Sequence, residues 1–291
     1  MVKLHTKAPA KINLTLDVLS RRNDGYHNLS TIMHEIPLVD DIDIYLGQGK
    51  GVRAKTNFAF IRGDKNLASR ACKLFFDELT TIGYDYEKVP GVFIDIHKRI
   101  PVGAGLGGGS ADAAAVLNVL NEHFRFPFSL DKLMAIGAQL GADVPFCIHG
   151  GCALCEGIGE MITPQKTLPH CFIVMAKPTA SISTADIFSL YRTDKSRMRP
   201  DTAGALSALE AGDLGGVSRR VYNVLQEYAE RGVKDIFNIH DILLRQGALG
   251  ASMSGSGSSV FGLFDERETA ETCYAALKTN YVDVYLLEVG A

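Results

Sequence analysis

The segment PVGAGLGGGSADAAAVLNVL, residues 101–120, places glycine at five of seven positions directly before a run of helix-forming residues. Glycine loses more backbone entropy on folding than any other residue, so this concentration is costly unless something approaches the backbone closely. An alternating strand, GVFIDIHKRI, precedes it, and a helix is predicted from Ser110 to about Phe124. The order of strand, glycine turn and helix start predicts an anion site, because N–H groups converge at the positive end of a helix. Ser110 is placed to cap the helix or to contact a phosphate or its metal ion.

Other glycine-rich motifs fit this segment less well. Gly103, Gly105 and Gly108 match the G-x-G-x-x-G of dinucleotide-binding folds. That interpretation also requires a parallel strand after the helix, ending in an acidic residue, whereas here a second helical segment follows. A Walker loop requires a lysine after the glycines, and a flexible linker is not expected between a strand and a capped helix. A phosphate-binding turn remains as the prediction.

The rest of the chain alternates strand and helix patterns, which predicts an α/β protein. With 291 residues, 46% of them hydrophobic, we expect two domains, residues 1–160 and 161–291, divided between Cys155 and Thr167. The predicted strands are 4–22, 31–46, 91–100, 144–157, 171–178, 258–264 and 282–289; the predicted helices are 66–83 (capped by Asn66, closed by Gly83), 110–124, 129–141 (capped by Ser129, ended by Gly141), 201–232 with a glycine break, and 266–280.

Four potential metal ligands lie close together in the sequence. Cys147, His149, Cys152 and Cys155 fall within nine residues, and a zinc or redox site would require them to converge. In a strand, however, residues three apart face opposite sides of the sheet. We therefore expect buried structural thiols and no metal site here.

Charge and hydropathy limit the partners. The formal net charge is -3 and no run of lysine or arginine exceeds two residues, so the basic footprint of a nucleic-acid-binding protein is missing. The segment MVKLHTKAPAKINLTLDVL interrupts its apolar residues with lysines and a proline, and no apolar run is long enough to span a membrane. We expect a cytoplasmic protein, monomer or homodimer, with small-molecule partners and neither nucleic acid nor membrane.

Two further segments accompany the glycine turn. ASMSGSGSSVFGLF, residues 251–264, is a serine and glycine turn before a strand, which forms either a tight hairpin or a second loop lying against the first. APAKINLTLDV, residues 8–18, places Lys11 and Asn13 on the same side of a strand. A lysine at such a position usually extends to water.

Together these segments resemble the GHMP family of small-molecule kinases. The resemblance spans nearly the whole chain, and within the family DGYH and LGADVPF are similar to a branch whose acceptor is a cytidine-diphosphate-linked alcohol. Ala111 and Asp112 stand where some members carry Ser-Asn, which leaves open any metal role at this position. The matching motifs are PAKINLTL (9–16), RRNDGYHNL (21–29), PVGAGLGGGSADAA (101–114), LGADVPF (140–146) and SGSGSSVFG (254–262).

The resemblance implies a fold and an activity. The implied fold is mixed α/β (α+β), with a ribosomal S5 domain 2-like, ATP-binding N-terminal domain, a ferredoxin-like C-terminal domain, and the substrate site at their interface. The implied activity is phosphorylation of a hydroxyl by ATP, with Mg²⁺ held mainly by the phosphates. Asp143 would be the base that takes the hydroxyl proton, and Lys11 beside it would keep the aspartate ionised.

The resemblance also implies binding residues. Tyr26 and His27 would hold a cytosine, Phe188 would stack on it, and Asn13 and Thr184 would lie near the diphosphate and sugar-like end. A mevalonate or homoserine kinase, or a nucleotide-binding module without catalysis, stays open as an alternative. The implied ATP-binding residues are Asn66, Pro101, Val102, Gly103, Ala104, Gly105, Leu106, Gly107, Gly108, Gly109, Ser110 and Ala111; the implied substrate-binding residues are Asn13, Tyr26, His27, Asp143, Thr184, Phe188, Ser254 and Gly255.

Overall fold

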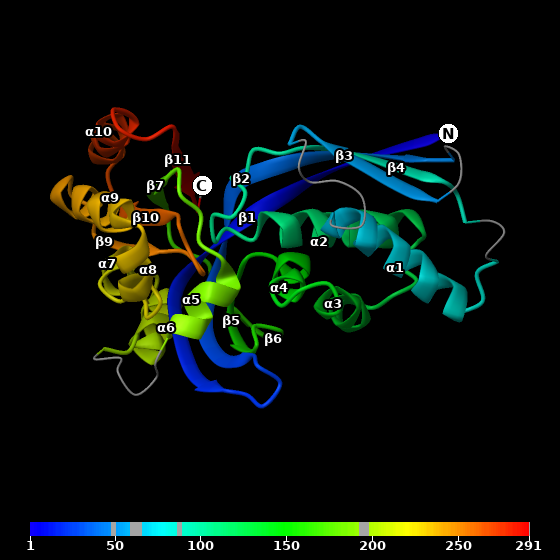
Figure 1. The fold of residues 1–291 in the computed structure, drawn as a ribbon, viewed down its shortest axis with the longest axis horizontal. Coiled ribbons are helices and arrows are strands. Elements are labelled where there is room, and N and C mark those ends of the chain that lie inside the picture. Colours follow the sequence, from blue (N-terminus) through cyan, green and yellow to red (C-terminus); the bar gives the residue numbers. More distant parts are fainter. Residues whose placement is uncertain (48–50, 59–65, 86–88, 192–197, 291) are drawn as a thin grey trace. The chain divides into compact units, whose positions relative to one another are not determined.

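Two compact units, each assembled from separate stretches of chain, make up the protein (Figure 1). The structure is a computed structural model that describes residues 1–47, 51–58, 66–85, 89–191 and 198–290. The expected division between residues 160 and 161 stays a prediction. Unit 1 consists of Met1–Ala10, Leu38–Ile100 and Gly107–Gly150, and unit 2 of Lys11–Pro37, Pro101–Leu106 and Gly151–Ala291.

Two long strands, β1 (Val2–Arg21) and β2 (His27–Leu46), each contribute one half to each unit. Their alternation of apolar and polar residues is the period of a strand with one buried face. The turn between them contains Gly25 at φ +89°, a backbone conformation that glycine adopts without strain, and Asp24 accepts a hydrogen bond from the backbone of Tyr26. The predicted hairpin with its Asp-Gly turn is confirmed.

Unit 1 packs helices against one face of a sheet (Figure 1). The strand order is β3-β4-β2-β1, with β4 antiparallel to β2 and β3 parallel to β4. The caps predicted for two helices are confirmed, because Asn66 accepts from the backbone of Ala68 and Ser69, and Ser129 accepts from that of Lys132. The additional elements are β3 (Val52–Thr56), α1 (Leu67–Thr81), β4 (Val92–His97), α2 (Gly108–His123), α3 (Leu130–Ala138) and α4 (Val144–His149).

The prediction of one strand over 144–157 is wrong, because this segment forms helix α4 followed by strand β5 (Cys152–Gly157). Pro145 lies in the first turn of α4, where its missing N–H costs nothing. Gly150 and Gly151, at φ +75° and +66°, then end the helix. Cys152 and Cys155 are thiols buried in β5.

Unit 2 contains part of the sheet to which the unit 1 strands also belong, and a second sheet of its own. In the first, β5 pairs with β2, β6 pairs with β5, and a two-residue strand, β8, runs parallel to β1. The second is antiparallel, in the order β11-β7-β10-β9, and α9 and α10 pack against it. The further elements are β6 (Met161–Gln165), β7 (Cys171–Lys177), α5 (Thr184–Leu190), α6 (Thr202–Ala211), α7 (Leu214–Ser218), β8 (Tyr222–Asn223), α8 (Gln226–Gly232), α9 (Lys234–Arg245), β9 (Gly250–Met253), β10 (Val260–Phe264), α10 (Arg267–Lys278) and β11 (Asp283–Val289).

The prediction of helix over residues 201–232 is partly wrong. Three helices form there, and β8 separates the last two. Helix α9, which follows, was not predicted, although its apolar residues Ile236, Ile239 and Leu243 have helical spacing and are fully buried in the core of unit 2.

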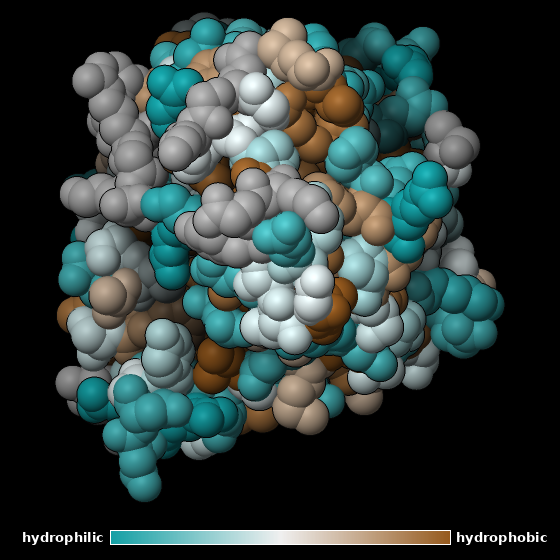
Figure 2. All heavy atoms as spheres, turned by 90° about the vertical axis from the view of Figure 1, so that its right-hand side faces the viewer, coloured by the Kyte–Doolittle hydropathy of each residue, from teal (hydrophilic) through white to brown (hydrophobic). Residues whose placement is uncertain are grey.

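One face of the surface carries both polar and apolar side chains (Figure 2). Figure 2 shows one face, on which hydrophobic side chains form separate brown patches among teal ones. Single exposed apolar side chains, such as Phe126 and Leu130, are normal on folded proteins. Within the described ranges, no helix combines the length and apolar character needed to cross a bilayer.

Candidate active site

The glycine-rich turn leads directly into α2. The helix begins at Gly108, two residues earlier than predicted, and its N-cap is Gly107 in the left-handed conformation (φ +69°). Of the two roles expected of Ser110, the cap is excluded, because the left-handed backbone of Gly107 starts the helix and Ser110 lies within its first turn; contact with a phosphate or its metal ion stays a prediction. Glycine offers no capping side chain, so the N–H groups of the first turn are placed to meet an anion instead.

Two glycine loops of unit 2 lie against each other, as one of the two sequence interpretations predicted. A side chain at Gly105 would bring its Cβ to 2.1 Å from the carbonyl oxygen of Ser254. The hydroxyl of Ser254 donates to the oxygen of Gly105 at 3.0 Å, and the backbone N–H of Ser259 donates to that of Ala104 at 3.1 Å. Gly105 is thus required for packing between the two loops, whatever they bind.

Lys11 is buried beside these loops, with only 3% of its surface exposed. Its backbone N–H donates to Leu106 O at 3.1 Å and its ammonium donates to Asn13 Oδ1 at 2.8 Å. A Cβ at Gly255 would lie 3.2 Å from the same ammonium. The prediction that Lys11 and Asn13 share a side of the strand is confirmed, whereas the expectation that the lysine extends to water is wrong.

A short chain of hydrogen bonds orients Asn13. Its Nδ2 donates to Thr31 Oγ1 at 2.8 Å, and the Thr31 hydroxyl donates to the carbonyl oxygen of Thr15 at 2.6 Å. Because a hydroxyl carries a single hydrogen, Thr31 accepts from Asn13, which turns the amide oxygen of Asn13 towards Lys11. Thr31 was missed at the sequence level, although it is a polar residue at an inward position of an alternating strand.

Asn223 is a second residue that the sequence analysis missed. It is 1% exposed, and its Nδ2 donates to the carbonyl oxygens of Met253 and Gly255, both at 2.8 Å. Its Oδ1 accepts from the backbone N–H of Leu225. Its Nδ2 group holds the Ser-Gly loop, and its only signal in the sequence is an asparagine within the apolar run VYNVL.

Asp143 lies in unit 1, in the turn before α4, where it is partly exposed. It occupies the N-cap position, yet its carboxylate does not cap the helix. The same turn approaches the start of α2, because a Cβ at Gly141 would lie 3.9 Å from Ser110 Oγ. The pairing of Asp143 with Lys11 of unit 2 stays a prediction.

The proposed base-binding residues lie in unit 2. The rings of His27 and Phe188 have centroids 5.3 Å apart and planes 30° apart, so the structure brings these two together. Partial burial, with the nearby charge of Arg21, lowers the pKa of His27. Tyr26 is 60% exposed, with its ring available to a ligand. Phe188 also packs against the unit 2 core, so its burial has a structural cause as well.

Two other predicted residues have structural partners of their own. Thr184, the first residue of α5, lies with its hydroxyl 2.9 Å from that of Ser256 in the Ser-Gly loop. Asn66 uses its amide oxygen to cap α1, which accounts for its burial, and its contact with an adenine stays a prediction. In the part of the chain that the structure describes, no group of three or more histidine, cysteine, aspartate or glutamate residues is arranged to hold a metal ion.

Comparison with known proteins agrees with this arrangement. The family model of the GHMP kinases N terminal domain matches residues 66–151, and that of the GHMP kinases C terminal domain matches residues 205–283. Proteins named 4-diphosphocytidyl-2-C-methyl-D-erythritol kinase from two strains of Clostridium botulinum are similar over nearly the whole length. The Kyoto strain protein is 43% identical over 282 residues (97% of this chain, 98% of the relative), and the Eklund 17B protein is 40% identical over 284 residues (97% and 99%).

Solved structures give the same result. A crystal structure of 4-(cytidine 5'-diphospho)-2C-methyl-D-erythritol kinase has a TM-score of 0.81 at 31% identity, covering 99% of this chain and 100% of that one. A homoserine kinase from Cytophaga hutchinsonii, 20% identical with a TM-score of 0.74 over 98% and 94% of the two chains, shares the fold. The chain therefore belongs to the GHMP kinases and, among them, to the family of the 4-diphosphocytidyl-2-C-methyl-D-erythritol kinases.

Proposed function

We propose that the protein transfers the γ-phosphoryl group of ATP to the 2-hydroxyl of 4-diphosphocytidyl-2-C-methyl-D-erythritol, giving the 2-phosphate and ADP. The observation that carries this proposal is 43% identity over 97% of the chain to proteins named for this activity. The reaction belongs to the non-mevalonate route to isoprenoid precursors, and we place it in the cytoplasm.

The glycine turn is the proposed site for the phosphates of ATP. Gly103, Gly105 and Gly107 have φ between +65° and +75°, so the backbone curves without side chains at the start of α2. The N–H groups of the first turn and the positive end of the helix dipole both favour a polyanion. The hydroxyl of Ser110 and the backbone of Gly108 and Gly109 complete this donor set.

Mg²⁺ fits such a site without a dedicated protein cage, because it prefers phosphate oxygens and keeps several waters. When bound it would neutralise charge that develops on the transferred phosphoryl group. The donors described above are backbone N–H groups and the hydroxyl of Ser110, which suit phosphate oxygens and leave the metal to the phosphates.

Lys11 and Asp143 are the proposed chemical pair. The acceptor oxygen forms a bond to the γ-phosphorus while the bond to the bridging oxygen of ADP breaks, and the hydroxyl proton passes to Asp143. The ammonium of Lys11, fixed by Asn13, would keep the aspartate ionised and lower the pKa of the alcohol. Protein groups of this kind act mainly by positioning and by stabilising charge.

His27, Phe188 and the exposed ring of Tyr26 are the proposed cytosine site. Flat apolar faces stack on a base, and the lowered pKa of His27 favours a neutral ring that both donates and accepts hydrogen bonds. A short aliphatic acceptor such as mevalonate or homoserine would leave these groups without partners. Discrimination against an acceptor without the base should therefore be strong, on the order of 10⁴ in kcat/KM.

The test is ADP release with each candidate alcohol in turn. We expect turnover with the cytidine-diphosphate derivative and essentially none with mevalonate, homoserine or galactose. Asp143→Asn should reduce turnover by about 10²-fold or more, the effect of losing a general base. Comparable rates with mevalonate would support the alternative of another GHMP kinase, and ATP binding without ADP release from any of these alcohols would support a nucleotide-binding module.

A further inference from the structure

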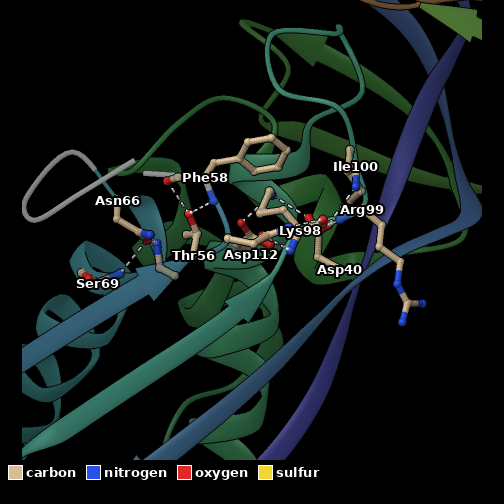
Figure 3. Close-up of polar contacts among 11 residues, drawn as sticks. Asp40, Thr56, Phe58, Asn66, Ser69, Lys98, Arg99, Ile100 and Asp112 are labelled. Atoms are coloured by element: carbon tan, nitrogen blue, oxygen red, sulfur yellow. Dashed lines mark hydrogen bonds and ion pairs between the residues drawn. The ribbon is translucent and has the colours of Figure 1, made fainter. Parts of the chain in front are cut away.

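A buried group of three charges lies at the base of the glycine-rich turn, and the proposed reaction does not use it (Figure 3). Asp40 lies on β2, Lys98 follows the last residue of β4, and Asp112 lies near the start of α2. Their exposed fractions are 0%, 6% and 5%. We refer to Asp40, Lys98 and Asp112 as the ion triad. All three belong to unit 1.

The ammonium of Lys98 joins the two carboxylates. Its Nζ lies 2.5 Å from Asp40 Oδ2 and 2.7 Å from Asp112 Oδ2. Asp40 uses its other oxygen, Oδ1, to accept the backbone N–H groups of Arg99 and Ile100. One carboxylate thus binds both the lysine side chain and the backbone that follows it, and Figure 3 shows these contacts converging on Asp40.

These contacts fix both ends of the turn. The turn begins at Pro101, directly after Arg99 and Ile100. It ends at Gly107, and Asp112 lies in the helix α2 that follows. The start of α2 also packs on the triad, since a Cβ at Gly108 would lie 3.3 Å from Lys98 Nζ and 2.9 Å from Ile100 Cγ2. The entry and the exit of the turn are therefore bound to the same three side chains.

We propose that Asp40, Lys98 and Asp112 are positioning residues, which hold the two ends of the glycine turn at the separation that the phosphates of ATP require. The inference rests on the proposed function of the turn. A segment with several glycines has many backbone conformations, and holding its ends reduces the entropy lost when it closes on an anion. Charged hydrogen bonds suit this task because they are directional and costly to leave half made.

Substitutions at Asp112 can distinguish positioning of the glycine turn from simple stabilisation of unit 1. Asp112→Ala removes the contact from α2 and leaves Lys98 paired with Asp40, a neutral pair that is compatible with burial. Asp112→Asn keeps an acceptor oxygen for Lys98 in the same place. The matched control is Asp95→Ala, which removes the ion pair between Asp95 and Lys55 on the neighbouring strands, where both side chains are more than a third exposed.

The measurements are the Kd for ATP by calorimetry and the KM for the alcohol. Asp112→Ala should raise the Kd for ATP about 10-fold, since small misplacements of binding groups carry costs of this size or greater. Its KM for the alcohol should stay within about 2-fold of wild type, whereas Asp112→Asn and Asp95→Ala should bind ATP nearly as wild type does. If Asp112→Ala does not fold, Asp112→Ser, whose hydroxyl is too short to reach Lys98, takes its place with the same expectation.

Two results would overturn the inference. One is an unchanged Kd for ATP in a folded Asp112→Ala or Asp112→Ser protein. The other is an equal loss of ATP and alcohol affinity, which would mean that the triad only stabilises the fold. Failure of the proposed function itself is distinct, because it is measured on the wild-type protein, which would then not bind ATP or would not release ADP specifically with the cytidine-diphosphate derivative.

Discussion

Two of the buried lysines in the described ranges, Lys98 and Lys11, have different partners. Lys98, 6% exposed, lies between two carboxylates, whereas Lys11, 3% exposed, donates to the neutral amide of Asn13. The carboxylates around Lys98 outnumber the ammonium, so that group has no positive charge to offer a ligand when both are ionised. The hydrogen bond from Lys11 to an amide fixes the position of the ammonium, and the amide itself carries no charge.

The difference separates two uses of a buried cation. A lysine between carboxylates holds chain segments together, as Lys98 joins β2, the end of β4 and α2. A lysine oriented by an amide keeps its charge for a phosphate or for an acid that must stay ionised. The same residue type at similar burial is therefore expected to serve the fold in one unit and the reaction in the other.

The same substitution at both lysines should show the largest contrast. Lys98→Met leaves two buried carboxylates facing each other and should reduce the free energy of unfolding by about 3–5 kcal/mol. Lys11→Met should reduce turnover by about 10²-fold, while its loss of stability should be smaller, because an unpaired amide oxygen costs about 1–3 kcal/mol. Urea unfolding and ADP release are measured on both variants. Equal losses of stability would remove the distinction between the two lysines.

Local sequence patterns predicted the parts of the fold that depend on neighbouring residues. The alternation of apolar and polar residues predicted the strands β1 and β2. Asn66 and Ser129 predicted the starts of α1 and α3, because a capping side chain acts within one helical turn. The first part of the apolar run 144–157 was assigned to the wrong class, since short apolar segments fit either a strand or a helix, whereas its second part is the strand β5. The glycine pair and Pro145 in that run were the available signal.

Within the site, the sequence predicted only the residues that belong to recognisable motifs. Lys11 and Asn13 were predicted to lie together because residues two apart on a strand lie on the same face of the sheet. The ion triad joins residues 58 and 14 positions apart, and Thr31 contacts Asn13 from the opposite strand, 18 positions away. Such contacts depend on register and packing, which periodicity does not specify. A buried Asp40 beside the exposed-face residue Asp41 looks, in the sequence, like an ordinary pair of surface acids.

The orientation of Lys11 can be tested through Thr31. Thr31→Val keeps the shape but removes the hydroxyl that accepts from Asn13 and donates to Thr15. The amide of Asn13 is then free to turn, and we expect turnover to fall about 10-fold through misplacement of the ammonium. Thr31→Ser restores the hydroxyl and should restore most of the turnover. Wild-type turnover in the valine variant, or no recovery in the serine variant, would show that the hydrogen-bond chain does not position Lys11.

The smallest expected effect is the pH dependence of stability that the ion triad contributes. Burial raises the pKa of Asp112 to about 7, Asp40 adds to the rise, and Lys98 opposes it. In the unfolded chain an aspartate has a pKa of about 3.9, so between about pH 4 and pH 7 the folded state binds more protons and stability falls as pH rises. Burial lowers the pKa of His34 to about 4, which acts in the opposite direction in this range.

Comparing wild type with Asp112→Asn by urea unfolding at pH 5, 6, 7 and 8 removes the contribution of His34, because both proteins share it. The stability of wild type relative to Asp112→Asn should fall from pH 5 to pH 7 and then level off. Thr31→Val has no titrating group in its hydrogen-bond chain apart from Lys11, so its stability difference from wild type should stay constant over this range. A constant difference for Asp112→Asn as well would mean that Asp112 stays ionised throughout, and that the triad carries a net negative charge inside the protein.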